Sequence, residues 1–245
     1  MIKSSNPALS TEVFRKESTV STSEVMSLEG TVNKTGLLLL CVVGSAAWTW
    51  GSVSPQALLP LSLLSGIGGF VVALITHFKK HLSGITAPIY AILQGLFLGA
   101  ISYIFEMQYP GIVMQAVGLT FGTLFALLGA YKSGMIKATE NFKLGVAAAT
   151  GGIFLFYLVG MILSMFGFQL NVFYGNGLMG IGFSVIVVTI AALNLVMDFD
   201  FIENGVEYRS PKYMEWYAAF GLMVTLIWLY IEILRLLSKL QSRRD

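Results

Sequence analysis

The chain has 245 residues, of which 56% are hydrophobic and only 11% are charged, whereas about a quarter of residues are charged in an average soluble domain. This composition excludes an ordinary soluble fold, which cannot bury so much apolar surface. The formal net charge of +2 is too small to indicate a nucleic-acid partner.

The chain begins with a polar segment, residues 1–35, which carries four basic and four acidic residues among Ser and Thr. Its composition predicts a mobile cytoplasmic tail without a cleavable signal peptide. No linker interrupts the remainder, so residues 36–245 are predicted to form one membrane domain.

Seven apolar runs fill this domain, and each is long enough to cross a bilayer, which takes roughly 20 apolar residues in a helix. Backbone groups in lipid must be bonded within the segment, and the runs do not alternate as barrel strands do, so we expect α-helices. The fold class is therefore an all-α integral membrane protein. The predicted spans are Gly36–Val53, Ala57–Phe78, Pro88–Phe105, Ile112–Tyr131, Leu144–Phe168, Leu178–Phe199 and Tyr213–Leu237.

The positive charges indicate the orientation of these spans. Eleven of the 15 Lys and Arg precede the first span or lie in the second, fourth and sixth connections, and the other three connections have none. Lys and Arg near span ends favour the cytoplasmic side. The N-terminus is thus predicted to be cytoplasmic, and the tail Ser238–Asp245 to lie on the opposite side.

Small residues recur at four-residue spacing inside several spans. Helices in lipid associate through close backbone approach at such residues, so tight packing is expected there. The pairs are Gly95 with Gly99, Gly118 with Gly122, and Ser65 with Gly69.

Ionisable residues inside spans are the candidates for function, because their burial is costly. Asp198 and Asp200 close the sixth predicted span. Either they merely end a helix at the cytoplasmic interface, or they have a role, since acids at a helix C-terminus face the negative end of the dipole.

The seventh span carries a second group. Thr225 and Glu232 are seven residues apart, which places them on one face with a difference in depth of about 10 Å. Arg235 follows Glu232 by three residues and can pair with it. Two interpretations stay open: a snorkelling ion pair at the far interface, or a functional gate.

Enzyme chemistry has little support in the sequence. His77 and His81 flank two lysines in a connection and do not lie on a span with carboxylates, so no zinc site is indicated. The single Cys41 can form no intrachain disulfide. No phosphate-binding glycine loop occurs. We expect no enzymatic activity and no cofactor, apart from transient Ca²⁺.

Two strings resemble the Bax inhibitor-1 family, the transmembrane proteins containing a Bax inhibitor motif. The ending Met197-Asp198-Phe-Asp-Phe-Ile202 is similar to the family's Asp-Thr-Gln-x-Ile after an aromatic residue. The string from Leu222 to Leu237 is similar to its Leu-x-Leu-Asp-x-Ile-Asn-Leu-Phe-x-x-Ile-Leu-Arg. The glycines in residues 94–102 are similar, more weakly, to the small-residue pattern of the family's third span.

The resemblance implies six helices around a central seventh. Bacterial members of the family are described as pH-sensitive calcium leak channels, gated by two aspartates that share a proton. Asp198 matches the first aspartate, whereas the second falls on Thr225, which cannot ionise. Arg235 matches the family arginine, and Glu232 or Glu106 is available to pair with it.

Two functions are expected from this resemblance. The first is a pH-responsive calcium or cation leak in the bacterial inner membrane, with Asp198 and Asp200 binding calcium weakly and transiently. The second is a non-conducting protein that regulates membrane proteases or stress-response proteins. The sites expected along the ion pathway or gate are Asp198, Asp200, Thr225, Glu232 and Arg235.

Overall fold

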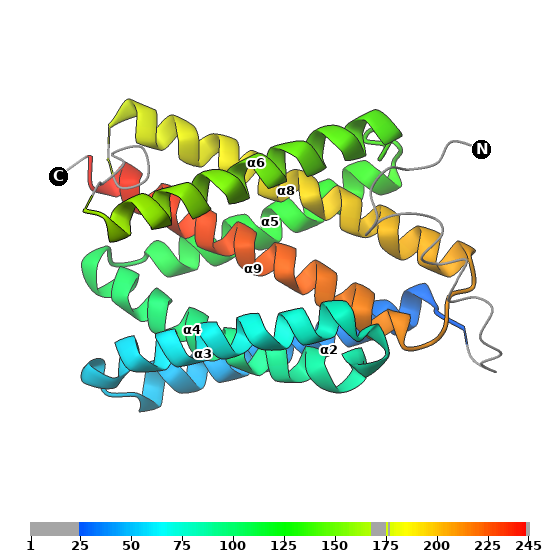
Figure 1. The fold of residues 1–245 in the computed structure, drawn as a ribbon, viewed down its shortest axis with the longest axis horizontal. Coiled ribbons are helices and arrows are strands. Elements are labelled where there is room, and N and C mark those ends of the chain that lie inside the picture. Colours follow the sequence, from blue (N-terminus) through cyan, green and yellow to red (C-terminus); the bar gives the residue numbers. More distant parts are fainter. Residues whose placement is uncertain (1–24, 168–174, 176, 244–245) are drawn as a thin grey trace. The chain divides into compact units, whose positions relative to one another are not determined.

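The computed structural model describes residues 25–167, 175 and 177–243. Seven long helices and one short 3₁₀ helix form in this part of the chain (Figure 1). Most of the predicted polar tail, residues 1–24, and most of the fifth connection, residues 168–174, lie outside the described residues. The elements are α2 (Leu28–Ser52), α3 (Pro55–Phe78), η1 (Lys80–Leu82), α4 (Ser83–Gln108), α5 (Ile112–Lys132), α6 (Glu140–Met165), α8 (Leu178–Glu207) and α9 (Met214–Gln241).

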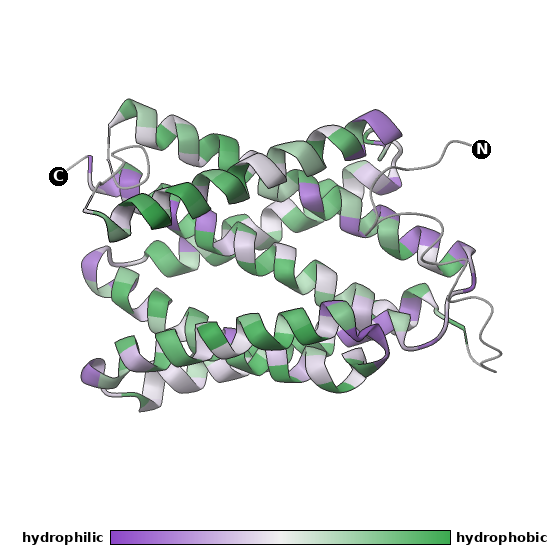
Figure 2. Cartoon of the chain, viewed as in Figure 1, coloured by the Kyte–Doolittle hydropathy of each residue, from purple (hydrophilic) through white to green (hydrophobic). Residues whose placement is uncertain are grey.

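All seven long helices are long and apolar enough to cross a membrane. At 1.5 Å per residue, even α5, with 21 residues, reaches about 31 Å, the thickness of a bilayer core. Figure 2 shows apolar residues along most of the length of the helices and hydrophilic residues mainly towards their ends. The predicted all-α membrane fold with seven spans is confirmed.

The helices divide between two compact units. The first unit comprises Met1–Met107 and Asp198–Val224, and the second comprises Gln108–Met197 and Thr225–Asp245. The first therefore holds α2, α3 and α4, and the second holds α5 and α6, while α8 and α9 are each divided between the two units.

Close packing in the first unit depends on the glycines of α4. A Cβ atom on Gly95 would collide with the Ser45 hydroxyl and the Val42 carbonyl of α2. One on Gly99 would collide with Thr49, one turn further along α2. The predicted close approach at Gly95 and Gly99 is confirmed, and it brings α4 against α2.

The glycines of α5 behave differently. Among the described residues, no neighbouring atom lies within 4 Å of a Cβ built on Gly118 or Gly122. The buried residues of α5 include Ala116 and Thr120, which lie on the opposite side of the helix. The predicted packing at Gly118 and Gly122 is wrong, because this pair is exposed.

α2 begins at Leu28, well before the predicted start at Gly36. The Ser27 hydroxyl caps the helix by accepting a hydrogen bond from the Gly30 N–H at 3.0 Å. The Thr31 hydroxyl then donates to the Ser27 carbonyl. Hydropathy marks the apolar crossing, whereas these polar residues extend the helix beyond it. Residues 28–35, predicted to belong to the tail, are helical.

α8 and α9 also continue past their predicted ends. α8 reaches Glu207, so Asp198 and Asp200 lie inside the helix and do not close it. The argument from the helix dipole therefore does not apply to them, because that effect falls off within the last turn. α9 reaches Gln241, so Lys239, predicted to lie in the C-terminal tail, is helical.

α9 is the most buried of the seven spans. Within its most apolar stretch 56% of residues are buried, against 11% to 39% in the others. A helix that is apolar and buried on most sides is typical of a bundle interior. The arrangement of six helices around this one stays a prediction.

Candidate ion-pathway site

Two carboxylates lie on the part of α8 that belongs to the first unit. The Oδ2 atom of Asp198 is buried. Asp200 is half-buried, and its Oδ2 accepts a hydrogen bond at 2.8 Å from the side chain of Asn204, one turn later. Residues two apart in a helix point about 200° away from each other. Both residues are half-buried; Asp198 has a buried carboxylate oxygen, and Asp200 lies on the other side of the helix with its hydrogen bond to Asn204.

Carboxylates could also bind metal. Within the described residues, no group of three or more His, Cys, Asp or Glu side chains is placed to hold a metal ion. Hard cations such as Ca²⁺ take six or more oxygen ligands when bound tightly. Weak, transient binding of calcium at Asp198 and Asp200 stays a prediction.

Thr225 opens the part of α9 that belongs to the second unit. It is buried, with 8% of its surface exposed. Asp198 belongs to the first unit, so the pairing of these two positions, which the resemblance implied, stays a prediction.

The second unit contains an ion pair on α9 with a buried carboxylate. The Arg235 Nη1 atom donates to Glu232 Oε1 at 3.0 Å, as the spacing of three residues predicted. Tyr157 of α6 completes the group. Its hydroxyl donates to the same Glu232 oxygen at 3.0 Å and accepts a hydrogen bond from Arg235 at 2.8 Å. The guanidinium also lies 5.4 Å from the centre of the Tyr157 ring.

These contacts explain how a carboxylate is tolerated here. Glu232 is only 2% exposed, and a buried charge requires both a counter-charge and hydrogen bonds. Arg235 supplies the charge and Tyr157 a further donor. Because Arg235 keeps 38% of its side chain exposed, both interpretations of the pair, snorkelling and gating, fit this geometry.

Lys239 lies one turn beyond Arg235 and is also buried. Its Nζ atom donates to the Gly180 carbonyl at 3.1 Å and to the Ser184 hydroxyl at 3.0 Å, both on α8. The sequence placed Lys239 in a solvated tail. Its neutral oxygen partners come from a distant part of the chain, and the local sequence does not reveal them.

A second buried carboxylate, Glu215, lies at the start of α9 in the first unit. It is fully buried and accepts hydrogen bonds from the N–H and the hydroxyl of Ser27 at 2.8 and 2.9 Å. Lys34 pairs with one carboxylate oxygen and Lys212 with the other, the latter at 3.2 Å. This cluster joins the start of α2 to the start of α9.

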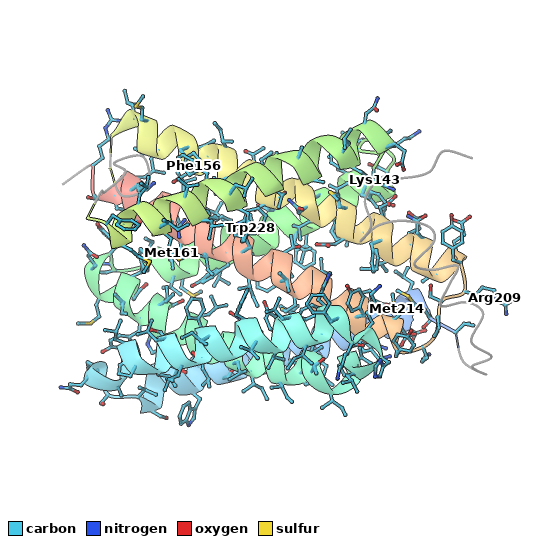
Figure 3. All side chains as sticks on the ribbon, in the orientation of Figure 1. Lys143, Phe156, Met161, Arg209, Met214 and Trp228 are labelled. Atoms are coloured by element: carbon cyan, nitrogen blue, oxygen red, sulfur yellow. The ribbon has the colours of Figure 1, made fainter. Side chains whose placement is uncertain are left out.

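The segment before α2 is held at the same place. The Met26 N–H donates to the Ser210 carbonyl at 2.7 Å, and Val25 bridges to Pro211. Arg209 lies in this connection and Met214 at the first turn of α9 (Figure 3). The Glu215 carboxylate is thus held by Ser27, Lys34 and Lys212 within the protein, which indicates a structural anchor.

A model of the Bax inhibitor 1-like family matches residues 6–242. The chain belongs to this family. No curated protein and no solved structure matches the chain. The family match covers both units, including every residue predicted to lie on the ion pathway.

For this Bax inhibitor 1-like protein, the structure brings together one predicted pair, Glu232 and Arg235, and adds Tyr157 and Lys239. Sequence reasoning missed Tyr157, because a tyrosine in an apolar span carries no signal of its own. Glu215 lies inside the seventh predicted span, but the sequence does not reveal its partners. The available signal for the Ser27 cap was a serine followed by Glu29, an acid in the first turn of the helix.

Proposed function

We propose that this Bax inhibitor 1-like protein is a non-enzymatic leak for cations, calcium among them, and that Asp198 attracts the ion. The observation that carries the proposal is the burial of a carboxylate oxygen of Asp198 inside a helix that is long and apolar enough to cross a membrane. Ionisable residues in such spans are costly and typically mark ion pathways.

The other acids have lesser roles in this proposal. Asp200 is half-buried and adds negative charge two residues away, at the same mouth. Glu232 is held by Arg235 and Tyr157, so its charge is compensated while the pair is closed. Separation of this pair would expose a carboxylate to the ion, which makes it the candidate gate.

The proposed response to pH follows from Asp198. An ionised carboxylate attracts a cation, whereas a protonated one does not. Cation flux should therefore fall as the solution is acidified. A second carboxylate opposite Asp198 would steepen this response, because two carboxyls that share a site bind a proton jointly. Thr225 leaves the natural chain without that second acid if the family pairing applies.

The proposed location is the bacterial inner membrane, with a cytoplasmic N-terminus. Lys34 at the start of α2 and Lys212 before α9 both pair with Glu215, so positive charges from two separate segments gather at one end of the first unit. Lys and Arg gather on the cytoplasmic side of membrane proteins. A reporter fused to residue 245 tests the orientation and should give a non-cytoplasmic signal.

The experiment for the function is calcium entry into vesicles that contain the purified protein and a trapped calcium indicator. We expect faster entry than into protein-free vesicles and slower entry at acidic pH. Thr225→Asp should make the pH dependence steeper. Wild-type entry equal to that of protein-free vesicles at every pH would contradict the proposal and favour the non-conducting alternative.

A further inference from the structure

Four polar residues follow one face of α9 in the second unit. Successive intervals of seven, three and four residues separate Thr225, Glu232, Arg235 and Lys239, and these intervals keep side chains on one side of a helix. Lys239 lies about 6 Å along the axis beyond Arg235 and about 10 Å beyond Glu232. An ion that moves along this face from the C-terminal end of α9 meets Lys239 first, then Arg235, then Glu232.

Positive charge exceeds negative charge at this end. Glu232 is compensated by Arg235 at 3.0 Å, while Lys239 donates to two neutral oxygens, the Gly180 carbonyl and the Ser184 hydroxyl. In the described part of the second unit the other acid is Glu140. Glu140 lies in the first turn of α6 and pairs with Lys143. Figure 3 labels Lys143 near this end of the helix and Met161 near its other end.

Burial strengthens the effect of the excess charge. Lys239 is 5% exposed, and its two hydrogen bonds hold the ammonium group in place. Charges act over longer distances in surroundings of low dielectric constant, and salt screens buried charges less than exposed ones. Fixed positive groups in membrane pores act as barriers to cations.

We propose that Lys239, together with Arg235, forms a positive barrier that limits the entry of cations from the C-terminal end of α9. The inference rests on the proposed cation leak and adds its regulation: a fixed ammonium group opposes the passage of the cation at this end of α9. Removal of the lysine charge should therefore increase flux, and should do so for cations specifically.

The test compares Lys239→Met and Lys239→Gln with the wild type in vesicles. Calcium entry and the relative permeability of K⁺ and Cl⁻, from the reversal potential, are measured. We expect calcium entry to rise by about tenfold, which corresponds to about 1.4 kcal/mol, with a shift of selectivity towards K⁺. Lys239→Gln keeps a hydrogen-bond donor, so it serves if Lys239→Met fails to fold. Lys239→Arg should resemble the wild type.

Two controls separate charge from packing. Ser184→Ala removes one of the two hydrogen bonds of Lys239 but keeps the ammonium group, so it should change flux and selectivity much less than Lys239→Met. Lys143→Met removes a lysine from the far end of α6 and should have no effect. Two results would show that the lysine acts through packing and would overturn the inference. One is equal calcium entry in Ser184→Ala and Lys239→Met, and the other is an equal rise in the permeability of K⁺ and Cl⁻.

The remaining outcomes are distinguishable. The wild type could conduct while Lys239→Met and Lys239→Gln keep its flux and selectivity. This result would contradict the proposed barrier but not the cation leak. Absence of flux in the wild type and in all variants would overturn the proposed function itself, and the barrier with it.

Discussion

The carboxylate of Glu215, in the first turn of α9, accepts hydrogen bonds from both the backbone N–H and the hydroxyl of Ser27, the residue that caps α2. Two helix N-termini thus share one fully buried carboxylate. A negative group at a helix N-terminus is favourable, and here it serves α2 and α9 at once. Lys34 and Lys212 balance its charge.

Glu215→Gln should therefore destabilise the protein. The substitution removes the counter-charge of two lysines, and the loss of one partner from a buried ion pair costs about 3 kcal/mol or more. Thermal unfolding in detergent measures the effect. Glu140→Gln, which breaks an exposed pair with Lys143, should change the melting temperature little. Equal losses in the two variants would contradict the assignment of Glu215 as an anchor.

Gly30→Ala tests the same cluster from the side of α2. A Cβ at residue 30 would collide with the Glu215 carboxylate, whereas one at Gly36 would meet no described neighbour within 4 Å. Alanine is otherwise the better helix former by up to about 1 kcal/mol. We expect Gly30→Ala to lower the melting temperature and Gly36→Ala to leave it equal or higher. The reverse order would show that Gly30 does not face Glu215.

The hydroxyl of Tyr157 should stabilise the Glu232 and Arg235 pair. Tyr157→Phe leaves the ring beneath Arg235 but removes a buried hydrogen-bonding group, at a cost of about 1–3 kcal/mol. Residues that share a network are not additive, so a double-mutant cycle with Glu232→Gln should show a coupling of about 1 kcal/mol. Tyr103→Phe, where the ring packs edge-on against Trp50, is the control. Additive effects of Tyr157→Phe and Glu232→Gln would contradict the network.

The sequence predicts local relationships in this protein better than distant ones. The Glu232 and Arg235 pair follows from a spacing of three residues on one helix. Tyr157 does not, because it comes from another helix 75 residues away from Glu232. Nor does the burial of Lys239, whose partners lie 55 and 59 residues away on α8.

Helix ends are a further limit of prediction from sequence. Apolar runs locate the seven crossings, since lipid requires them, but several helices continue past these runs into polar sequence. Asp198 and Asp200 were therefore expected at a helix terminus and lie well inside α8. Ser27 was expected in a tail and caps α2. In both cases hydropathy marks the apolar stretch, whereas backbone hydrogen bonding continues the helix past it.

The central claim is that the carboxylate of Asp198, one oxygen of which is buried, attracts the permeating cation, and calcium entry into vesicles containing Asp198→Asn tests it most directly. The substitution removes the charge with little change in volume, so the fold should persist and entry should fall by about tenfold or more at neutral pH. Asp200→Asn, on the opposite side of α8, should have a smaller effect. Entry through Asp198→Asn at the wild-type rate, or a larger loss in Asp200→Asn, would contradict the account.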